Sequence, residues 1–341
     1  MAIGDIPDRD QRRDFGGDAP IVSVILPVYN ERETLPALEG RLLPVLRECA
    51  GERFEVILVD DGSVDGSAQI LDAFHARDPR LKVIHFSRNF GHQSALQAGL
   101  DVATGAAVIL MDADMQDPPE IVQQLVDQWR LGYEVVYAVR RRRMEGKLKR
   151  AAYAVFYRTL RTIAEIDVPL DSGDFCLIDR SVVRALNDLP ERNRFLRGLR
   201  SWVGFRQIGV EYDREARYGG ESKYTLVKLI RLALSGYIGF SAVPLRAAVW
   251  LGVSAAGTGF LIAIWALATK LWGVYTPRGW LSTVAVMLFI GGVQLLMLGV
   301  IGEYLSRVYD EVRQRPLYIV RSRLGFGARE ADAAAPDRES R

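Results

Sequence analysis

Two long uncharged stretches constrain the fold of this chain more than any other feature. Residues Ala247 to Thr269 and Gly279 to Gly302 contain no Asp, Glu, Lys or Arg, and each is about 23 residues long. A helix needs roughly 20 consecutive apolar residues to cross a bilayer core. The alternative is a buried helix in a large soluble core, but such helices rarely run so far without a charge. Both stretches are therefore predicted to be transmembrane helices.

Basic residues flank these two stretches unequally. The connecting loop offers only Lys270 and Arg278, whereas the segment after the second stretch carries Arg307, Arg313, Arg315, Arg321 and Arg323. Because positive charge stays on the cytosolic side, both termini and the large N-terminal region are predicted to be cytoplasmic. Two cysteines, Cys49 and Cys176, provide no disulfide framework, which fits a reducing compartment. We expect a multi-pass protein of the inner (plasma) membrane.

Upstream of these stretches, apolar runs of strand length alternate with amphipathic segments of helix length. Strands are predicted at Ile21 to Leu26, Glu55 to Val59, Lys82 to Phe86, Ala106 to Met111 and Glu134 to Val139. Helices are predicted at Thr34 to Cys49, Gly66 to His75, Gly91 to Ala103 and Pro118 to Gly132, the last with Asp117 as N-cap and Glu120 completing a capping box. This order is typical of an α/β fold with a mostly parallel sheet and covering helices.

Three polar clusters follow predicted strands. They are Tyr29-Asn30-Glu31, Asp60-Asp61-Gly62-Ser63 and Asp112-Ala113-Asp114. Open sheets of this kind bind ligands beyond the carboxyl ends of their strands. Three clusters on one predicted edge therefore indicate a single ligand site.

The two acidic clusters predict different chemistry. Asp112 and Asp114 point the same way from the end of a strand, and a hard cation such as Mg²⁺ relieves the repulsion between such carboxylates. Asp60 or Asp61 can accept hydrogen bonds from a ribose hydroxyl or a base N–H. A helix N-cap built from Ser63 or Asp65 is the alternative, and both can hold at once. Neither a dinucleotide-binding Gly-x-Gly-x-x-Gly nor a P-loop motif is present, so those nucleotide-binding folds are not supported.

The region after the sheet is basic and then amphipathic. Gly146 to Ile163 is predicted to be a basic helix, and Phe175 to Asp179 and Phe205 to Tyr212 are predicted strands. Ser222 to Phe240 places apolar residues at helical spacing with lysines toward another face, which is typical of a helix in the membrane interface. An ordinary core-facing helix is the alternative.

His75, His85 and His92 are too scattered to suggest a metal site, and each is expected at a surface or helix end.

Four motifs together carry a resemblance to a known family. They are Ile25 to Glu31, Val59 to Ser63, Asp112 to Glu120, and Gly220 to Tyr224. As a set they resemble family 2 glycosyltransferases, and more narrowly the polyprenyl-phosphate glycosyltransferases, which include undecaprenyl-phosphate glucosyltransferases and dolichol-phosphate mannose synthase. The resemblance extends from Ile21 to about Val320. One departure is Cys176, where many relatives have Arg, and this puts a local phosphate contact in question.

The resemblance implies a GT-A fold and an inverting transfer, with roles for particular residues. It places the nucleotide sugar at Pro27, Tyr29, Glu31, Asp60, Asp61, Asp112, Ala113 and Gln116. It places the metal, Mg²⁺ or Mn²⁺, at Asp112, Asp114 and Gln116, and the catalytic residues at Asp174, Asp114, Arg217 and Lys223. UDP-glucose is the favoured donor, with UDP-galactose, GDP-mannose and UDP-aminoarabinose-type donors open. A homotetramer would resemble known relatives, and no nucleic-acid partner is expected.

The acceptor's own chemistry shapes the remaining expectations. A lipid monophosphate with a second pKa near 6 is largely dianionic at neutral pH and hardly needs a general base. Asp174 is therefore weighed as an orienting or electrostatic residue at least as heavily as a proton acceptor. Cations near the membrane face would position the phosphate, and the candidates are Arg140, Arg141, Lys147, Lys149 and, with them, Ser222. The alternative for the basic residues is attraction to anionic lipid headgroups alone.

Five regions follow from these expectations. They are a disordered tail (1–19), a cytosolic GT-A domain (20–221), an interfacial amphipathic helix (222–243), a two-helix transmembrane domain (244–305) and a cytosolic C-terminal tail (306–341).

The predicted function is hexose transfer to a polyprenyl phosphate on the cytosolic face, giving a lipid-linked sugar for cell-envelope glycan modification. A GDP-mannose-dependent polyprenyl-phosphate mannose synthase is the alternative. A processive polysaccharide synthase would need Gln-x-x-Arg-Trp and more spans, and an inactive scaffold would have no use for Asp112, Asp114, Asp174 and Lys223.

Overall fold

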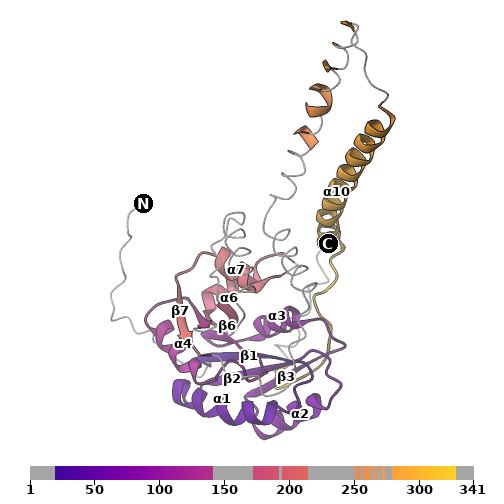
Figure 1. Ribbon diagram of the computed structural model, residues 1–341. Helices are drawn as coiled ribbons and strands as arrows, with labels where there is room; N and C mark the ends of the chain where they lie inside the picture. Colours follow the sequence, from indigo (N-terminus) through magenta and orange to yellow (C-terminus); the bar gives the residue numbers. More distant parts are fainter. Residues whose placement is uncertain are drawn as a thin grey trace, which may run out of the picture. The chain divides into compact units, whose positions relative to one another are not determined.

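The computed structural model describes residues 20–140, 172–191, 194–213 and 279–327, together with short helical pieces between 250 and 272. The chain forms two compact units. The first draws on residues 1–146, 167–222 and 315–341, and the second on residues 147–166 and 223–314. The described part of the first unit holds the sheet, and that of the second is helical (Figure 1).

One mixed sheet is the frame of the first unit (Figure 1). Its strands in the described part of the chain run in the order β7-β5-β6-β4-β1-β2-β3-β8. Their bounds are β1 Val22–Val28, β2 Phe54–Asp60, β3 Leu81–Phe86, β4 Ala107–Leu110, β5 Val135–Arg140, β6 Ser172–Asp179, β7 Gln207–Tyr212 and β8 Val320–Leu324. The central strands β4, β1, β2 and β3 pair in parallel, whereas β6 and β8 run antiparallel to their neighbours. The prediction of a mostly parallel sheet is confirmed.

Helices cover both faces of this sheet. Strand residues alternate between the faces, so that Val24 packs in one core cluster and its neighbour Ile25 in the other. The cluster with Val24 is closed by α1 (Leu35–Ala50), α2 (Ser67–Arg77) and α4 (Ile121–Arg130). The cluster with Ile25 is closed by α3 (His92–Val102), α6 (Arg180–Asn187) and α7 (Leu196–Trp202), on the opposite side of the sheet in Figure 1.

The predicted start of α4 is wrong. The helix begins at Ile121, and its N-cap residue Glu120 makes no side-chain capping hydrogen bond. The two prolines before it form a turn instead, in which Ile121 N–H donates to the carbonyl of Pro118 at 3.2 Å. Asp117 is 1% exposed and accepts a hydrogen bond from the hydroxyl of Tyr212 on β7. Asp117 therefore joins the helical layer to the sheet rather than capping the helix.

β8 (Val320–Leu324) belongs to the sheet, although the sequence analysis assigned residues 306–341 to a tail. β8 pairs antiparallel with β3 and so covers that edge of the sheet. The ring of Tyr318 stacks on Phe86 with centroids 5.0 Å apart, and its hydroxyl donates to Asp101 at 2.7 Å. A stacked ring and a hydrogen bond thus fix the chain just before the last strand.

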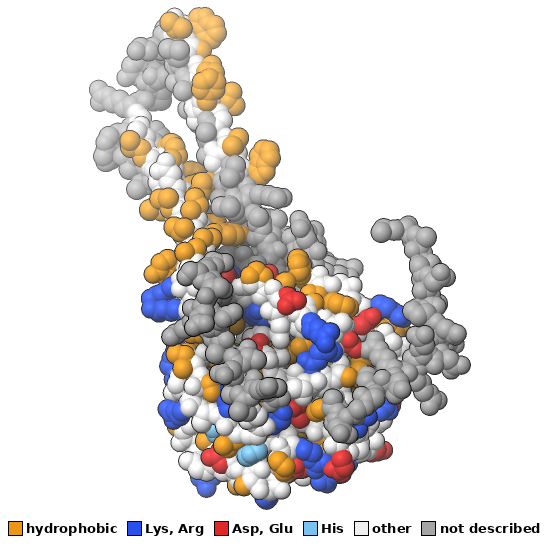
Figure 2. Space-filling model, turned by 180° about the vertical axis from the view of Figure 1, so that it is seen from behind, with side chains coloured by type: hydrophobic (Ala, Val, Ile, Leu, Met, Phe, Trp, Pro, Cys, Tyr) orange, Lys and Arg blue, Asp and Glu red, His pale blue; other side chains and the backbone are white. Residues whose placement is uncertain are grey.

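The second unit contains α10 (Trp280–Arg313), the described helix that is long and apolar enough to cross a membrane. Its candidate span, Phe289–Arg313, has a mean hydropathy of 1.5, and none of the apolar window within it is buried inside the structure. Hydrophobic side chains line the surface of this helical unit in Figure 2. The first predicted span is described only in pieces, where a Cβ on Gly252 would lie 3.5 Å from Met297 of α10. The predicted interfacial helix lies outside the described residues.

The contacts of Tyr318 predict a graded loss of stability. Tyr318→Phe should lower the free energy of unfolding by about 0.5–1 kcal/mol, because it removes the hydrogen bond to Asp101 but keeps the stacked ring. Tyr318→Ala should cost clearly more, because the contact with Phe86 is lost as well. Thermal unfolding in detergent measures both, with Tyr309→Phe on the exposed surface of α10 as control. Equal losses for the two Tyr318 variants would contradict the stacking contact.

Candidate active site

The pairing of the strands brings the predicted acidic residues to one edge of the sheet. β1, β2 and β4 are parallel, so Tyr29, Asp61 and Asp112 follow strand ends on the same side. β6 runs the other way, and Leu110 on β4 pairs with Cys176 on β6. Extending that register by two residues puts Asp112 beside Asp174. The structure therefore brings together two carboxylates that lie far apart in the sequence.

A histidine lies between these two carboxylates. His92 is the first residue of α3, and its Nε2 is 3.6 Å from Asp112 Oδ1 and 3.7 Å from Asp174 Oδ2. Burial lowers the pKa of His92, but a hydrogen bond to Asp174 and the nearby carboxylates outweigh burial and raise it. The surroundings of the imidazole between the two acids thus favour its charged form. The expected helix-end position of His92 is confirmed, but the sequence did not predict its contacts with two carboxylates that follow or lie on other strands.

The surroundings of Asp112 disfavour the charged form of its carboxylate. Burial raises its pKa to about 6, and the charges of Asp174, Asp117 and Asp114 add to this effect against the opposing charge of His92. Such crowding of carboxylates is relieved by a bound cation. Asp114 accepts a hydrogen bond at 3.1 Å from the backbone N–H of Gln116, which fixes the loop.

The donor set fits a metal that arrives with its substrate. Among the described residues, no cluster of three or more His, Cys, Asp or Glu side chains is spaced to hold a metal ion. Mg²⁺ is commonly held by one or two protein carboxylates, with phosphate and water oxygens filling the rest of its shell. Asp112 and Asp114 provide this minimal set, and the assignment of Asp112, Asp114 and Gln116 as ligands stays a prediction.

Asp60 and Asp61 both engage the protein itself. Asp60 is 3% exposed, accepts from Ser63 N–H at 2.9 Å and contacts His85 Nδ1 at 2.9 Å. Asp61 accepts the backbone N–H groups of Phe90 at 2.6 Å and Gly91 at 3.0 Å. Burial raises the pKa of Asp61 despite these hydrogen bonds. Asp61 therefore secures the loop from which α3, and with it His92, begins.

The turn after β2 and the loop after β1 are docked on each other. Gly62 has a φ of +75°, and a Cβ there would lie 2.6 Å from the backbone of Arg88, so the turn requires glycine. Asn30 Oδ1 accepts from Val64 N–H at 2.9 Å. α2 starts after Gly66, and the side chain of Asp65 accepts from Ser67 N–H at 3.0 Å, which gives Asp65 rather than Ser63 the capping contact.

The predicted nucleotide-binding residues of the β1 loop differ in their exposure. Tyr29 is 48% exposed at the end of β1, and Pro27 lies within that strand. Glu31 accepts a hydrogen bond from the hydroxyl of Thr34 at 2.8 Å, so at least one of its oxygens serves the start of α1. Ala113 is buried, and Gln116 is 8% exposed. The exposed ring of Tyr29 is the surface on this loop that a base could stack against.

Two arginines that the sequence analysis did not single out complete the surroundings of Asp174. Arg197 Nη2 lies 3.3 Å from Asp174 Oδ1, and Arg200 is 3% exposed with its guanidinium against the thiol of Cys176. Burial raises the pKa of Asp174, but the hydrogen bond to His92 and the charges of Arg197 and Arg200 hold it well below its usual range. Asp174 is therefore a stable anion.

Several predicted residues lie outside the described part of the chain. Arg140 ends β5, but only its backbone is described. The remaining ones are Arg141, Lys147, Lys149, Arg217, Ser222 and Lys223. Their assignment to the acceptor phosphate or to catalysis stays a prediction.

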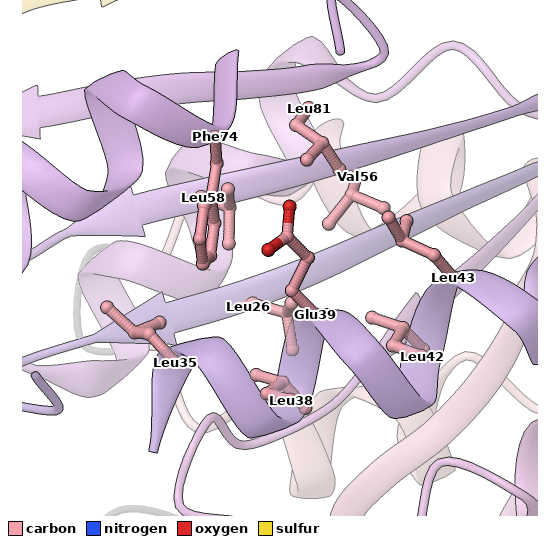
Figure 3. Close-up of a pocket in the computed structure, with 10 residues that line it drawn as sticks. All are labelled: Leu26, Leu35, Leu38, Glu39, Leu42, Leu43, Val56, Leu58, Phe74 and Leu81. Carbon is pink, nitrogen blue, oxygen red and sulfur yellow. The ribbon is translucent and has the colours of Figure 1, made fainter. Parts of the chain in front are cut away.

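A small apolar pocket lies away from this site, between α1, α2 and the sheet (Figure 3). It is lined mainly by leucines, with Val56, Phe74 and the side chain of Glu39, and its volume is about 20 Å³. A space of this size holds about one water molecule. The pocket is therefore a packing gap and not a substrate site.

Comparisons with known proteins show which family this chain belongs to. Residues 23–186 match the family described as glycosyl transferase family 2, and residues 243–308 match the GtrB C-terminal hairpin. The chain is 47% identical over 305 residues to the uncharacterized glycosyltransferase YkcC of Bacillus subtilis, covering 89% of this chain and 94% of that protein. It is 40% identical over 301 residues to the SfII prophage-derived bactoprenol glucosyl transferase of Shigella flexneri, covering 88% and 97%. A solved structure of the mannosyltransferase PcManGT from Pyrobaculum calidifontis, in complex with GDP-Man and Mn²⁺, aligns over 85% of each chain at 19% identity and a TM-score of 0.45.

The chain belongs to glycosyl transferase family 2. It is an enzyme of the glycosyltransferase class, with the GT-A-like α/β fold that the sequence motifs implied. The resemblance drawn from those motifs is confirmed.

The buried contact between Asp60 and His85 predicts a pH-dependent stability. Asp60 raises the pKa of His85 through a hydrogen bond, burial opposes this, and Asp72 at 2.9 Å from Nε2 raises the pKa further. A raised pKa in the folded state means that the charged imidazole stabilises the fold below about pH 6.5, and that this contribution is lost as the pH rises through the folded pKa. The expectation of a surface position for His85 is wrong, because it is 8% exposed on β3.

His85→Gln should therefore lower the thermal midpoint most at mildly acidic pH. The difference from wild type should shrink as the pH is raised, and thermal scans between about pH 5.5 and 9 measure it. Asp72→Asn, which removes the more exposed partner, should give a smaller effect of the same sign. A difference that grows with pH would contradict the charged pair.

Proposed function

We propose that this enzyme transfers a hexose from a nucleotide-diphosphate sugar, with UDP-glucose favoured, to a polyprenyl phosphate such as undecaprenyl phosphate. The observation that carries the proposal is the 40% identity to a bactoprenol glucosyl transferase over nearly the whole of both chains. The apolar helix α10 in the same chain supports a lipid acceptor, because it can hold the enzyme at a bilayer. The product would be a lipid-linked sugar for modification of cell-envelope glycans.

In this reaction an oxygen of the lipid phosphate attacks the anomeric carbon of the donor sugar. The bond from that carbon to the diphosphate breaks, and attack from the opposite face inverts the configuration. Asp112 and Asp114 would hold the divalent cation, Mg²⁺ or Mn²⁺, which when bound neutralises the charge that develops on the departing nucleoside diphosphate. Tyr29 would stack on the base, and Asp60 and Asp61 hold the loops that surround it.

Asp174 acts in this scheme as an orienting anion. An efficient proton acceptor has a pKa near the operating pH, whereas the pKa of Asp174 lies well below the usual range for a carboxyl group. The acceptor phosphate is already largely dianionic near neutral pH and has little need to lose a proton. Asp174 is therefore suited to align sugar hydroxyls and to hold His92 and Arg197 in place.

The membrane part of the proposal rests on α10 and the segment before it. With 34 residues, α10 is about 51 Å long, and the hydrocarbon core of a bilayer is about 30 Å thick. The helix is therefore long enough to cross and to continue beyond the membrane. We propose that Ala247 to Thr269 form the other span, before α10 in the sequence, so that both termini and the sheet are cytoplasmic on the inner (plasma) membrane, and that the enzyme assembles as a homotetramer.

A donor panel tests the function directly. Purified enzyme in detergent is incubated with undecaprenyl phosphate, Mg²⁺ or Mn²⁺, and either UDP-glucose, UDP-galactose or GDP-mannose. We expect a glycolipid with the mass of hexosyl undecaprenyl phosphate from UDP-glucose, and mass spectrometry of the lipid extract measures it. No glycolipid from any donor would reject the proposed acceptor, and product from GDP-mannose alone would replace the proposed donor.

The metal assignment predicts a matched pair of variants. Asp114→Asn should lower turnover by about 100-fold or more, because it weakens the stabilisation of the leaving group. Asp127→Asn removes a carboxylate from the exposed side of α4 and should leave turnover unchanged. Thermal unfolding shows whether both variants fold. Wild-type rates in Asp114→Asn, or full activity after chelation with EDTA, would contradict the assignment.

A further inference from the structure

The short helix α7 presents two cations to the neighbourhood of Asp174. Arg197 and Arg200 are three residues apart and so lie on one side of the helix. Together with Asp174, they line the same small cavity beside β6, whose other walls are apolar. Two guanidinium groups therefore share one carboxylate in an otherwise apolar setting.

Neither guanidinium is satisfied by the described part of the chain. Arg200 is 3% exposed, yet its Nε and Nη2 have no hydrogen-bond partner there, and its described contacts are the thiol of Cys176 and the ring of Tyr137 at 5.5 Å. Arg197 donates a single hydrogen bond, from Nη2 to Asp174, and its Nε is also without a partner. Buried N–H groups without hydrogen-bond partners are costly, and two cations here face one carboxylate, so this arrangement favours an additional anion.

The order of strands indicates which substrate would bring that anion. Along the sheet, β2 ends at Asp60 and leads to Asp61, β1 leads to Tyr29, β4 leads to Asp112 and Asp114, and β6 carries Asp174. The site therefore runs from the nucleotide end, through the metal and diphosphate, to Asp174. The two arginines pack against β6 and β5, as their contacts with Cys176 and Tyr137 show, and thus lie at the end farthest from the nucleotide. In the proposed reaction this end is the one left for the acceptor.

We propose that Arg197 binds the phosphate of the lipid acceptor beside Asp174, with Arg200 as a positioning residue beneath it. This inference rests on the proposed function and adds two cations to those that the sequence suggested. Arg197 is the contact residue because its side chain is 24% exposed, whereas Arg200 is buried. Its planar guanidinium has further N–H groups to donate while Nη2 stays on Asp174, so it can bridge carboxylate and phosphate. The positive charge of Arg200 reduces the electrostatic repulsion between a phosphate dianion and Asp174.

Separate titration of the two substrates tests the proposal. Arg197→Gln should raise the KM for undecaprenyl phosphate about tenfold or more, because a charge-assisted hydrogen bond to phosphate is lost, and should leave the KM for UDP-glucose unchanged. Arg197→Lys keeps the charge and should recover part of the loss. Arg184→Gln removes an exposed arginine from the neighbouring helix α6 and should change neither constant.

Direct binding gives a readout that does not depend on turnover. Thermophoresis in detergent, without donor, should show weaker binding of undecaprenyl phosphate to Arg197→Gln and unchanged binding of UDP. Arg200→Lys should weaken lipid binding less than Arg197→Gln, because its charge stays below the contact. If Arg197→Gln does not fold, as judged by thermal unfolding, Arg197→Lys is compared with wild type instead. The KM for undecaprenyl phosphate and the KM for UDP-glucose then decide.

The possible outcomes separate this proposal from the proposed function. A wild-type enzyme that glycosylates no lipid phosphate would reject the function itself. A wild-type enzyme that is active, with an Arg197 variant whose KM for the acceptor is unchanged, would overturn only the role of Arg197. A fall in kcat alone, with both KM values and lipid binding unchanged, would also overturn it and would assign Arg197 to the positioning of Asp174.

Discussion

The antiparallel pairing of β6 with β4 is the constraint on which the site depends. It sets Cys176 opposite Leu110 and, two residues further, Asp174 beside Asp112. A shift of one residue in this register would turn Asp174 to the other face of the sheet, away from His92 and Arg197. On β6, the buried Leu177 packs in one core cluster and the buried Ile178 in the other. Packing on both faces of the sheet therefore fixes the register. The position of Asp174 beside Asp112 is thus a result of core packing.

At the edge of the sheet that carries the candidate site, the acidic and basic side chains come from different secondary-structure elements. Strand ends contribute the carboxylates, and the starts of α3 and α7 contribute His92 and Arg197. The pKa values of the two acids shift in opposite directions: burial, with other carboxylates nearby, raises that of Asp112 to about 6, whereas the hydrogen bond to His92 and the nearby cations lower that of Asp174 despite burial. This difference separates a residue suited to receive a metal from one suited to remain anionic beside a phosphate.

The sequence predicted what is set locally and missed what is set by packing. The strands and the acidic clusters after them were predictable, because apolar periodicity and strand-end polarity are properties of short segments. His92, Arg197 and Arg200 were not singled out, since each gains its significance from contacts with β4, β5 or β6. The start of α4 was misplaced because Asp117 bonds to Tyr212, a residue far along the chain.

The last strand, β8, has a consequence for how the chain tolerates change at its C-terminal side. Its sequence, VRSRL, has three polar residues between two apolar ones, and β3 is its strand neighbour in the described sheet. Without it, the backbone N–H and C=O groups of β3 would form a free sheet edge, the kind of surface through which proteins aggregate. Truncations that remove residues 318–324 should therefore yield poorly soluble protein even though they leave every acidic residue of the site intact. Purification tags are better placed beyond Gly327.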